Sequence, residues 1–205
     1  MSDEHPPTPR DPQGSSSAGP DAVPVVNIAN VLTVLRIALV PVFLLVLFVD
    51  DGQDTVWRIA ATVVFAVAAI TDRVDGQLAR KYGLVTDFGK MADPIADKAL
   101  IGAALVGLSV LGDLPWWVTA VIAVREIGIT LVRFAVIRHG VIPAGRGGKL
   151  KTLVQSFAIG LYLFPLPDQV QFAAVSLMGL AVVLTVYTGV DYIVQAVRLR
   201  RGVAS

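Results

Sequence analysis

Residues 57–111 read WRIAATVVFAVAAIT, then DRVDGQLARKYGLVTDFGKMADPIADK, then ALIGAALVGLSVL. Two apolar runs therefore flank a charged segment that contains Asp72, Asp75, Asp93 and Asp97. Spacings of three and four place side chains on one face of a helix, so the segment predicts two helices that each present an aspartate pair. Both pairs border apolar helices of bilayer length, where a charge at mid-depth costs about 2.5 to 3.5 kcal/mol on insertion scales. Helix capping or a solvated face would explain one such aspartate, but four favour a functional site.

Four carboxylates in one small, partly dehydrated volume repel one another unless cations neutralise them. An all-oxygen set with no histidine or cysteine nearby favours Mg²⁺ or Mn²⁺ over zinc. Four acids leave room for two ions, which in two-metal sites lie about 4 Å apart and bind a phosphoryl group between them. The small residues Gly76, Ala79 and Gly89 leave space for a ligand to approach the backbone, and Arg80 adds a cation at its edge.

The complete pattern is Asp72-x2-Asp75-Gly76-x2-Ala79-Arg80-x8-Gly89-x3-Asp93-x3-Asp97. It resembles the signature of the CDP-alcohol phosphotransferase family, with every fixed position and every gap in place. The resemblance implies a nucleotide donor beside the small residues and Arg80, and two metal ions held by the four aspartates. It also makes Asp97 the candidate general base on the acceptor hydroxyl. Metal proximity would lower the pKa of that carboxyl, so Asp97 as a pure metal ligand stays an alternative.

Composition predicts an integral membrane protein. The chain has 205 residues, of which 55% are hydrophobic, and a mean hydropathy of +0.69. A chain with this composition is too apolar to be an ordinary soluble domain. The sequence contains no cysteine, which excludes disulfides and thiolate metal sites, and we expect no nucleic-acid partner.

The predicted fold is all-α, with six transmembrane helices. Residues 1–26 are rich in proline and serine and predict a disordered cytoplasmic tail, without the basic start and apolar run of a signal peptide. Residues 27–198 predict a six-helix membrane catalytic domain, and 199–205 a basic tail. The expected spans are 30–49, 56–80, 90–111, 115–138, 150–166 and 170–197, each near the roughly 20 residues needed to cross a bilayer.

Loop charges predict the orientation. With the amino terminus inside, the inner segments hold Arg80, Lys81, Lys90, Arg138, Arg146, Lys149, Lys151, Arg198, Arg200 and Arg201. The outer loops hold Asp50, Asp51, Asp54, Asp113 and Asp168. Only Arg58 disagrees, so the positive-inside rule places both termini and the acid cluster on the cytoplasmic side. We therefore expect a multi-pass protein of the inner (plasma) membrane whose active site faces the cytoplasm.

Polar residues also recur in the first span, at Asn30, Thr33 and Arg36. They can serve structure alone, with Arg36 reaching the interface or pairing with an aspartate and the other two capping or packing. The resemblance implies instead that they lie beside the nucleotide, because similar residues do so in the family.

The fourth span contains Arg125, Glu126 and Arg133, and Lys149 and Lys151 open the fifth. An internal ion pair between Glu126 and Arg133 would leave Arg125 without a counter-ion. The four cations together predict a pocket for a phosphate monoester, which arginine binds through two parallel hydrogen bonds. For the lysines, attraction to anionic lipid is an alternative, worth about 1 kcal/mol each.

The patterns RE-x6-R and K-x-KT-x2-Q, the latter including Thr152 and Gln155, resemble bacterial family members that use glycerol 3-phosphate. The resemblance implies transfer of a phosphatidyl group from CDP-diacylglycerol to sn-glycerol 3-phosphate, giving phosphatidylglycerophosphate and CMP. It also implies a homodimer in the lipid bilayer. Inositol phosphate, serine or phosphatidylglycerol (a cardiolipin synthase) are alternative acceptors. A divalent-cation transporter is a further alternative, but it would need acids toward the outer face as well.

Overall fold

The computed structural model describes residues 28–82, 87–136 and 146–202. Side chains are described throughout these ranges except at residues 28–30, 72–82, 87–95, 97, 134–136, 146, 168, 200 and 201.

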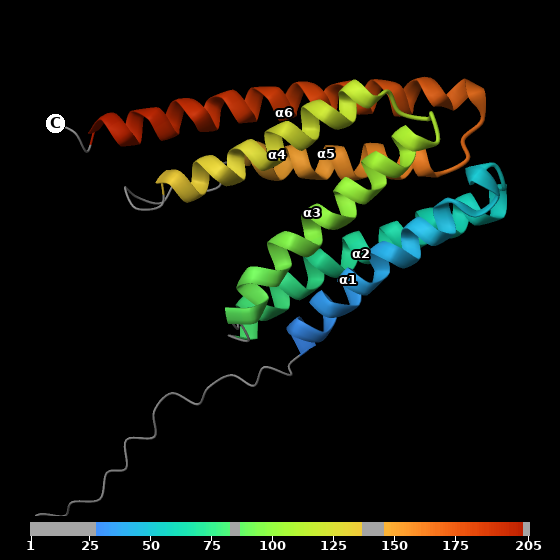
Figure 1. Ribbon diagram of the computed structural model, residues 1–205, viewed down its shortest axis with the longest axis horizontal. Helices are drawn as coiled ribbons and strands as arrows, with labels where there is room; N and C mark the ends of the chain where they lie inside the picture. Colours follow the sequence, from blue (N-terminus) through green and yellow to red (C-terminus); the bar gives the residue numbers. More distant parts are fainter. Residues whose placement is uncertain (1–27, 83–86, 137–145, 203–205) are drawn as a thin grey trace, which may run out of the picture.

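The described residues form α-helices and one short 3₁₀ helix, with no strand among them, which confirms the all-α prediction (Figure 1). The helices are α1 (Ile28–Leu47), η1 (Val49–Gly52), α2 (Thr55–Tyr82), α3 (Asp87–Val110), α4 (Trp116–Val136), α5 (Arg146–Leu163) and α6 (Asp168–Gly202). Each α-helix corresponds to one predicted span. The largest differences are at α5, which begins four residues before the expected start at 150, and at α6, which continues into the segment 199–205 that was predicted as a tail.

Successive helices run in opposite directions along the molecule (Figure 1). Helix α1 packs against α2 and α3, while α6 packs against α4 and α5. The two groups meet where α2 contacts α5 and where α3 contacts α4 and α5. Because direction alternates, α2 ends and α3 begins at the same end of the molecule, which is also where α5 begins (Figure 1).

Apolar side chains fill the contact between α1, α2 and α3. The rings of Phe43 and Phe65 lie 6.0 Å apart between centroids and are inclined by 50°. A glycine lets α3 approach α1 closely, because a Cβ atom at Gly107 would lie 2.7 Å from Leu47 Cδ2. A side chain at position 107 would therefore require Leu47 to shift.

Local chemistry explains how α2 begins and α3 ends. The Asp54 carboxylate accepts hydrogen bonds from the backbone N–H groups of Val56 (2.8 Å) and Trp57 (3.0 Å), which caps the first turn of α2. Gly112 has a φ of 81° after the last turn of α3, and the Asp113 N–H then donates to the Leu108 carbonyl at 3.0 Å. This left-handed glycine closure ends the helix and turns the chain toward α4.

Arg58, the one cation that disagrees with the predicted orientation, is neutralised by its neighbours. Its Nη1 lies 2.6 Å from Asp113 Oδ2, and its Nη2 donates to the Tyr162 carbonyl at 3.0 Å. The arginine side chain is 12% exposed, so the pair joins α2, the α3–α4 turn and α5 away from most solvent. An internal ion pair at this end carries no net charge and leaves the charge asymmetry of the loops intact.

We expect Asp113→Asn to lower stability without lowering activity. The change leaves the largely buried Arg58 side chain without its counter-ion, which should lower the free energy of unfolding by about 1 to 2 kcal/mol. Thermal unfolding in detergent should shift down by a few degrees, while turnover at low temperature stays at the wild-type level. The exposed Asp191→Asn is the matched control, and an unchanged melting temperature in Asp113→Asn would contradict a stabilising pair.

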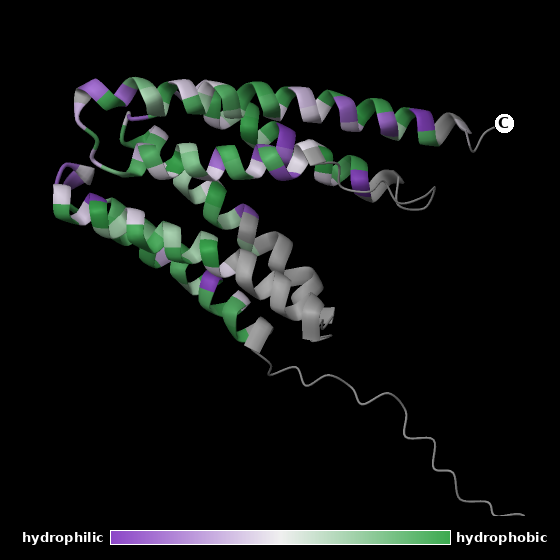
Figure 2. Cartoon of the chain, turned by 180° about the vertical axis from the view of Figure 1, so that it is seen from behind, coloured by the Kyte–Doolittle hydropathy of each residue, from purple (hydrophilic) through white to green (hydrophobic). Residues whose placement is uncertain are grey.

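Apolar residues predominate along the coloured parts of the α-helices (Figure 2). Large hydrophobic side chains are exposed on every α-helix, including Leu45 at 73% and Phe172 at 79%. Within the described residues, one segment, Gln169–Leu199, is long and apolar enough to cross a membrane, and shorter apolar segments are Val31–Leu47, Thr55–Thr71 and Lys98–Val110.

Candidate active site

The acidic pattern falls on two helices in contact with each other. Asp72 and Asp75 lie in the second half of α2, and Asp93 and Asp97 lie in the first half of α3. Gly76, Ala79 and Arg80 are on α2, Gly89 is on α3, and Asn30 is in the first turn of α1. These side chains are outside the described part of the structure, so their convergence on a metal pair stays a prediction. The donor set, four carboxylates on adjacent helices, suits hard divalent cations.

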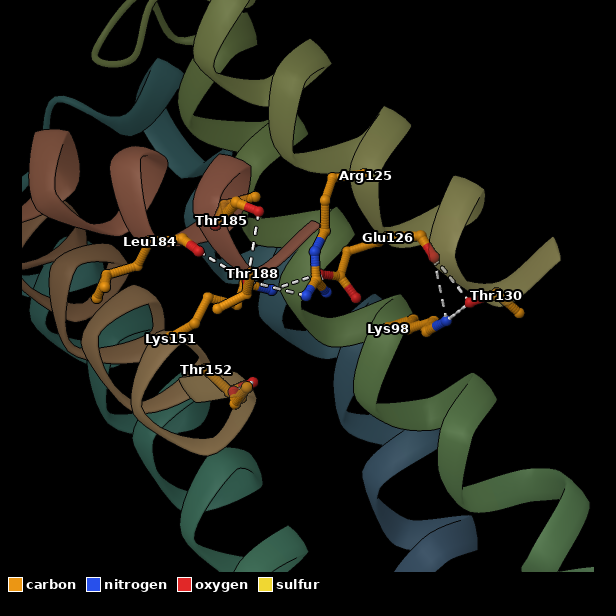
Figure 3. Close-up of polar contacts among 10 residues, drawn as sticks. Lys98, Arg125, Glu126, Thr130, Lys151, Thr152, Leu184, Thr185 and Thr188 are labelled. Atoms are coloured by element: carbon orange, nitrogen blue, oxygen red, sulfur yellow. Dashed lines mark hydrogen bonds and ion pairs between the residues drawn. The ribbon is translucent and has the colours of Figure 1, made fainter. Parts of the chain in front are cut away.

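The turn that carries Asp97 is anchored to α4 by the next residue. Lys98 Nζ donates to Thr130 Oγ1 and lies 3.5 Å from the Glu126 carbonyl oxygen (Figure 3). Thr130 Oγ1 donates to the same carbonyl at 2.7 Å. The acidic segment and the charged part of α4 are therefore neighbours, although they are separated by almost thirty residues of sequence.

Glu126 is the centre of a charged cluster formed by α4 and α5. Its Oε1 accepts a hydrogen bond from Arg125 Nη1 at 2.9 Å and another from Lys151 Nζ (Figure 3). The expected alternative, a pair between Glu126 and Arg133, is not among the contacts of the described residues, and Arg133 is exposed. Arg125 and Lys151 thus share one carboxylate, which joins α4 to α5 through two ion pairs.

Helix α6 supports Arg125 from the other side. Arg125 Nη2 donates to Thr188 Oγ1 at 3.1 Å, and Thr188 donates to the Leu184 carbonyl at 2.7 Å (Figure 3). A Cβ atom at Gly189 would lie 3.2 Å from Arg125 Cγ, so the glycine lets the arginine stem pass close to α6. Sequence reasoning missed Thr188 and Gly189, for which the only signal was a Thr-Gly pair inside a long apolar helix.

The four predicted acceptor cations separate into two groups. Arg125 and Lys151 converge on Glu126, and the Lys151 residue is 3% exposed. Arg133 and Lys149 are both exposed and make no ion pair among the described residues. The structure therefore brings together half of the predicted pocket.

Two cavities lie on either side of the contact between α3 and α5, and Ile101 and Thr152 line both. The larger, about 540 Å³, is mostly apolar and is bounded by α1, α2, α3 and α5, with Arg36 in its wall. Arg36 and Thr33 are both buried, at 0% and 1% exposure. The smaller, about 200 Å³, lies between α3, α4 and α5, and its polar wall consists of Lys98, Thr119, Glu126, Lys151, Thr152 and Gln155.

The cation cluster adjoins the turn that holds Asp97, and a family model matches the chain over both. The model of CDP-alcohol phosphatidyltransferase covers residues 26–187, which include the whole acidic pattern and the Arg125–Lys151 cluster. The chain belongs to the CDP-alcohol phosphatidyltransferase family. The family predicted from eight residues at fixed spacing is thereby confirmed.

Curated relatives within this family are similar over most of their length. A "probable phosphatidylglycerophosphate synthase" of Mycobacterium tuberculosis is 59% identical over 174 residues, which are 85% of this chain and 83% of that protein. The "CDP-diacylglycerol–glycerol-3-phosphate 3-phosphatidyltransferase" of Bacillus subtilis is 38% identical over 81% of this chain and 93% of its own length. The Escherichia coli protein of the same name is 36% identical over 82% and 93%. The match extends well beyond the acidic pattern in all three family members.

Proposed function

We propose that this chain transfers a phosphatidyl group from CDP-diacylglycerol to the primary hydroxyl of sn-glycerol 3-phosphate, releasing CMP. The relatives named for this reaction support the assignment, at identities from 36% to 59%. The observation that carries it in the structure is the Arg125–Glu126–Lys151 cluster, because it gathers an arginine and a lysine beside the turn that holds Asp97.

The donor is assigned to the acidic end of α2 and α3. Asp72, Asp75, Asp93 and Asp97 would hold two Mg²⁺ or Mn²⁺ ions, which when bound neutralise the diphosphate as its bond to CMP breaks. Asn30, Thr33, Arg36, Arg80 and the small residues of the pattern would line the nucleotide site. Asp97 would accept the proton of the attacking hydroxyl or complete the metal shell.

The acceptor is assigned to the cation cluster. A phosphate monoester carries close to two negative charges at neutral pH and takes charge-assisted hydrogen bonds from arginine and lysine. Arg125 and Lys151 supply such donors next to Lys98, and the Lys98 residue follows Asp97 directly. An acceptor held there by its phosphate would have its free hydroxyl within the neighbourhood of Asp97.

The acyl chains of the donor are assigned to the membrane side. The mostly apolar 540 Å³ cavity has Arg36 in its wall, so it offers an apolar volume next to a cation for the lipid and its head group. Exposed apolar side chains on all α-helices support six spans in a bilayer, since contiguous apolar surface of this extent is rare on soluble monomers. With the positive-inside rule, we place both termini and the active site in the cytoplasm. The implied homodimer stays a prediction.

Metal removal should abolish the reaction. We expect purified protein with CDP-diacylglycerol and sn-glycerol 3-phosphate to release CMP in Mg²⁺ or Mn²⁺, and to fall to background in EDTA. Readdition of either ion should restore the rate, which separates metal loss from unfolding. CMP release that is unaffected by EDTA would contradict the metal assignment.

The same assay decides the acceptor. Glycerol 3-phosphate should support CMP release, whereas inositol phosphate, serine and phosphatidylglycerol should not. Turnover with another acceptor alone would keep the chemistry and replace the substrate. Divalent-cation uptake into vesicles without CDP-lipid turnover would refute the enzyme and support a transporter.

A further inference from the structure

Gln155 is a buried amide in the wall of the 200 Å³ cavity. The residue is 3% exposed, and its Oε1 is buried with no hydrogen-bond partner among the described residues. A glutamine amide carries two donors and an acceptor, and a buried polar group normally finds a partner because leaving it unbonded is costly. An amide oxygen that is buried in a cavity wall without such a partner is therefore an acceptor available to a donor group of a ligand in that cavity.

The position of Gln155 relative to the charged cluster indicates which chemical groups a ligand in this cavity would need. Lys151 and Gln155 are four residues apart on α5, so they share one face with about 5 to 6 Å between their Cβ atoms. Lys98 faces them from α3 across the same cavity, and it adjoins Asp97 in sequence. A small molecule in the cavity can therefore meet a cation, an amide and the neighbourhood of the candidate base at three separate points.

We propose that Gln155 hydrogen-bonds the secondary hydroxyl of the acceptor, and that it thereby selects sn-glycerol 3-phosphate over its mirror image. The proposal rests on the proposed function. A hydroxyl both donates and accepts, as the amide does, whereas a fully ionised phosphate could satisfy only the amide N–H groups. The phosphate is left to Lys151 and Arg125, and the reacting primary hydroxyl is left to the Asp97 side.

Three contacts around the central carbon are sufficient to distinguish two mirror-image molecules. When sn-glycerol 1-phosphate places its phosphate and its primary hydroxyl at the same two points, its secondary hydroxyl points away from Gln155. The 2-deoxy analogue 3-hydroxypropyl phosphate has no secondary hydroxyl. Both compounds should therefore lose the same interaction, since each leaves the amide unbonded.

The experiment compares kcat/KM for these three acceptors in each enzyme preparation, with saturating CDP-diacylglycerol. We expect wild-type enzyme to favour sn-glycerol 3-phosphate over each of the other two by about tenfold. Gln155→Leu and the isosteric Gln155→Met should lower the value for sn-glycerol 3-phosphate to that of the other two, whose own values should not fall. The exposed Gln171→Leu is the matched control and should keep the wild-type preference.

Ratios within one preparation cancel any loss of folded enzyme. The proposal is overturned if wild-type enzyme uses 3-hydroxypropyl phosphate as well as glycerol 3-phosphate, or if the Gln155 variants slow all three acceptors equally. The first of these outcomes needs no variant at all. By contrast, wild-type enzyme that releases no CMP with any of the three would refute the proposed function itself.

Discussion

Asp97→Asn is expected to lower CMP release with glycerol 3-phosphate by about 10²- to 10⁴-fold. Asparagine has nearly the same size but cannot accept the hydroxyl proton, and a positioned general base contributes a factor of this order. It is also a weaker ligand for a divalent cation. The measurement is the initial rate of CMP release at saturating concentrations of both substrates.

Two controls separate chemistry from folding and from metal binding. Asp191→Asn changes an exposed aspartate whose carboxylate accepts a hydrogen bond from Gln195, and it should leave the rate unchanged. Titration of Mg²⁺ distinguishes the two roles, because a lost ligand shifts the metal requirement to higher concentration and a lost base does not. Near-normal turnover of Asp97→Asn would eliminate the base assignment.

Arg125→Ala is expected to raise the KM for glycerol 3-phosphate by about 10- to 100-fold, with a much smaller change in the KM for CDP-diacylglycerol. The reason is the loss of a charge-assisted hydrogen-bond donor at the acceptor phosphate, which is worth more than a neutral hydrogen bond. Arg125→Lys restores the charge but not the planar fork, so its KM should fall between those of the alanine variant and the wild type.

The control for Arg125 is Arg198→Ala, which removes an exposed arginine from the last turns of α6. It should change neither KM. Both kinetic constants are measured on the same protein, so a partly unfolded preparation lowers kcat without mimicking the expected split. A variant of Arg125 that weakens the donor more than the acceptor would refute the assignment of this cluster to glycerol 3-phosphate.

The helices were predictable because each is an apolar run with a charged or turn-forming boundary. Their ends were less so. Helix α5 begins at Arg146, so Gly147 and Gly148 belong to its first turn. A sequence prediction places such a glycine pair in a loop, because glycine is unfavourable in helices. A Cβ atom at Gly147 would lie 3.2 Å from Thr188 Cγ2, so the small residue serves packing against α6. Asp50 and Asp51 in η1 have positive φ angles, and hydrophobic periodicity does not predict this backbone conformation either.

The candidate site was likewise only partly predictable from the sequence. Residues defined by fixed spacing, such as the acidic pattern, could be found from the sequence because a family shares that spacing. Contacts between distant helices could not. Neither the joint pairing of Arg125 and Lys151 with Glu126 nor the hydrogen bond of Lys98 to Thr130 follows from helical periodicity, which relates residues only within one helix.

The shared carboxylate of Glu126 has a consequence for turnover. The product of the proposed reaction retains the acceptor's phosphate, so a pocket that bound this group without competition would also hold the finished lipid. In the proposed reaction, Glu126 would act as a resident anion, because its carboxylate already binds Arg125 and Lys151. Its return to both cations would offset part of the free energy lost when the product phosphate departs, which would favour release of the new phospholipid.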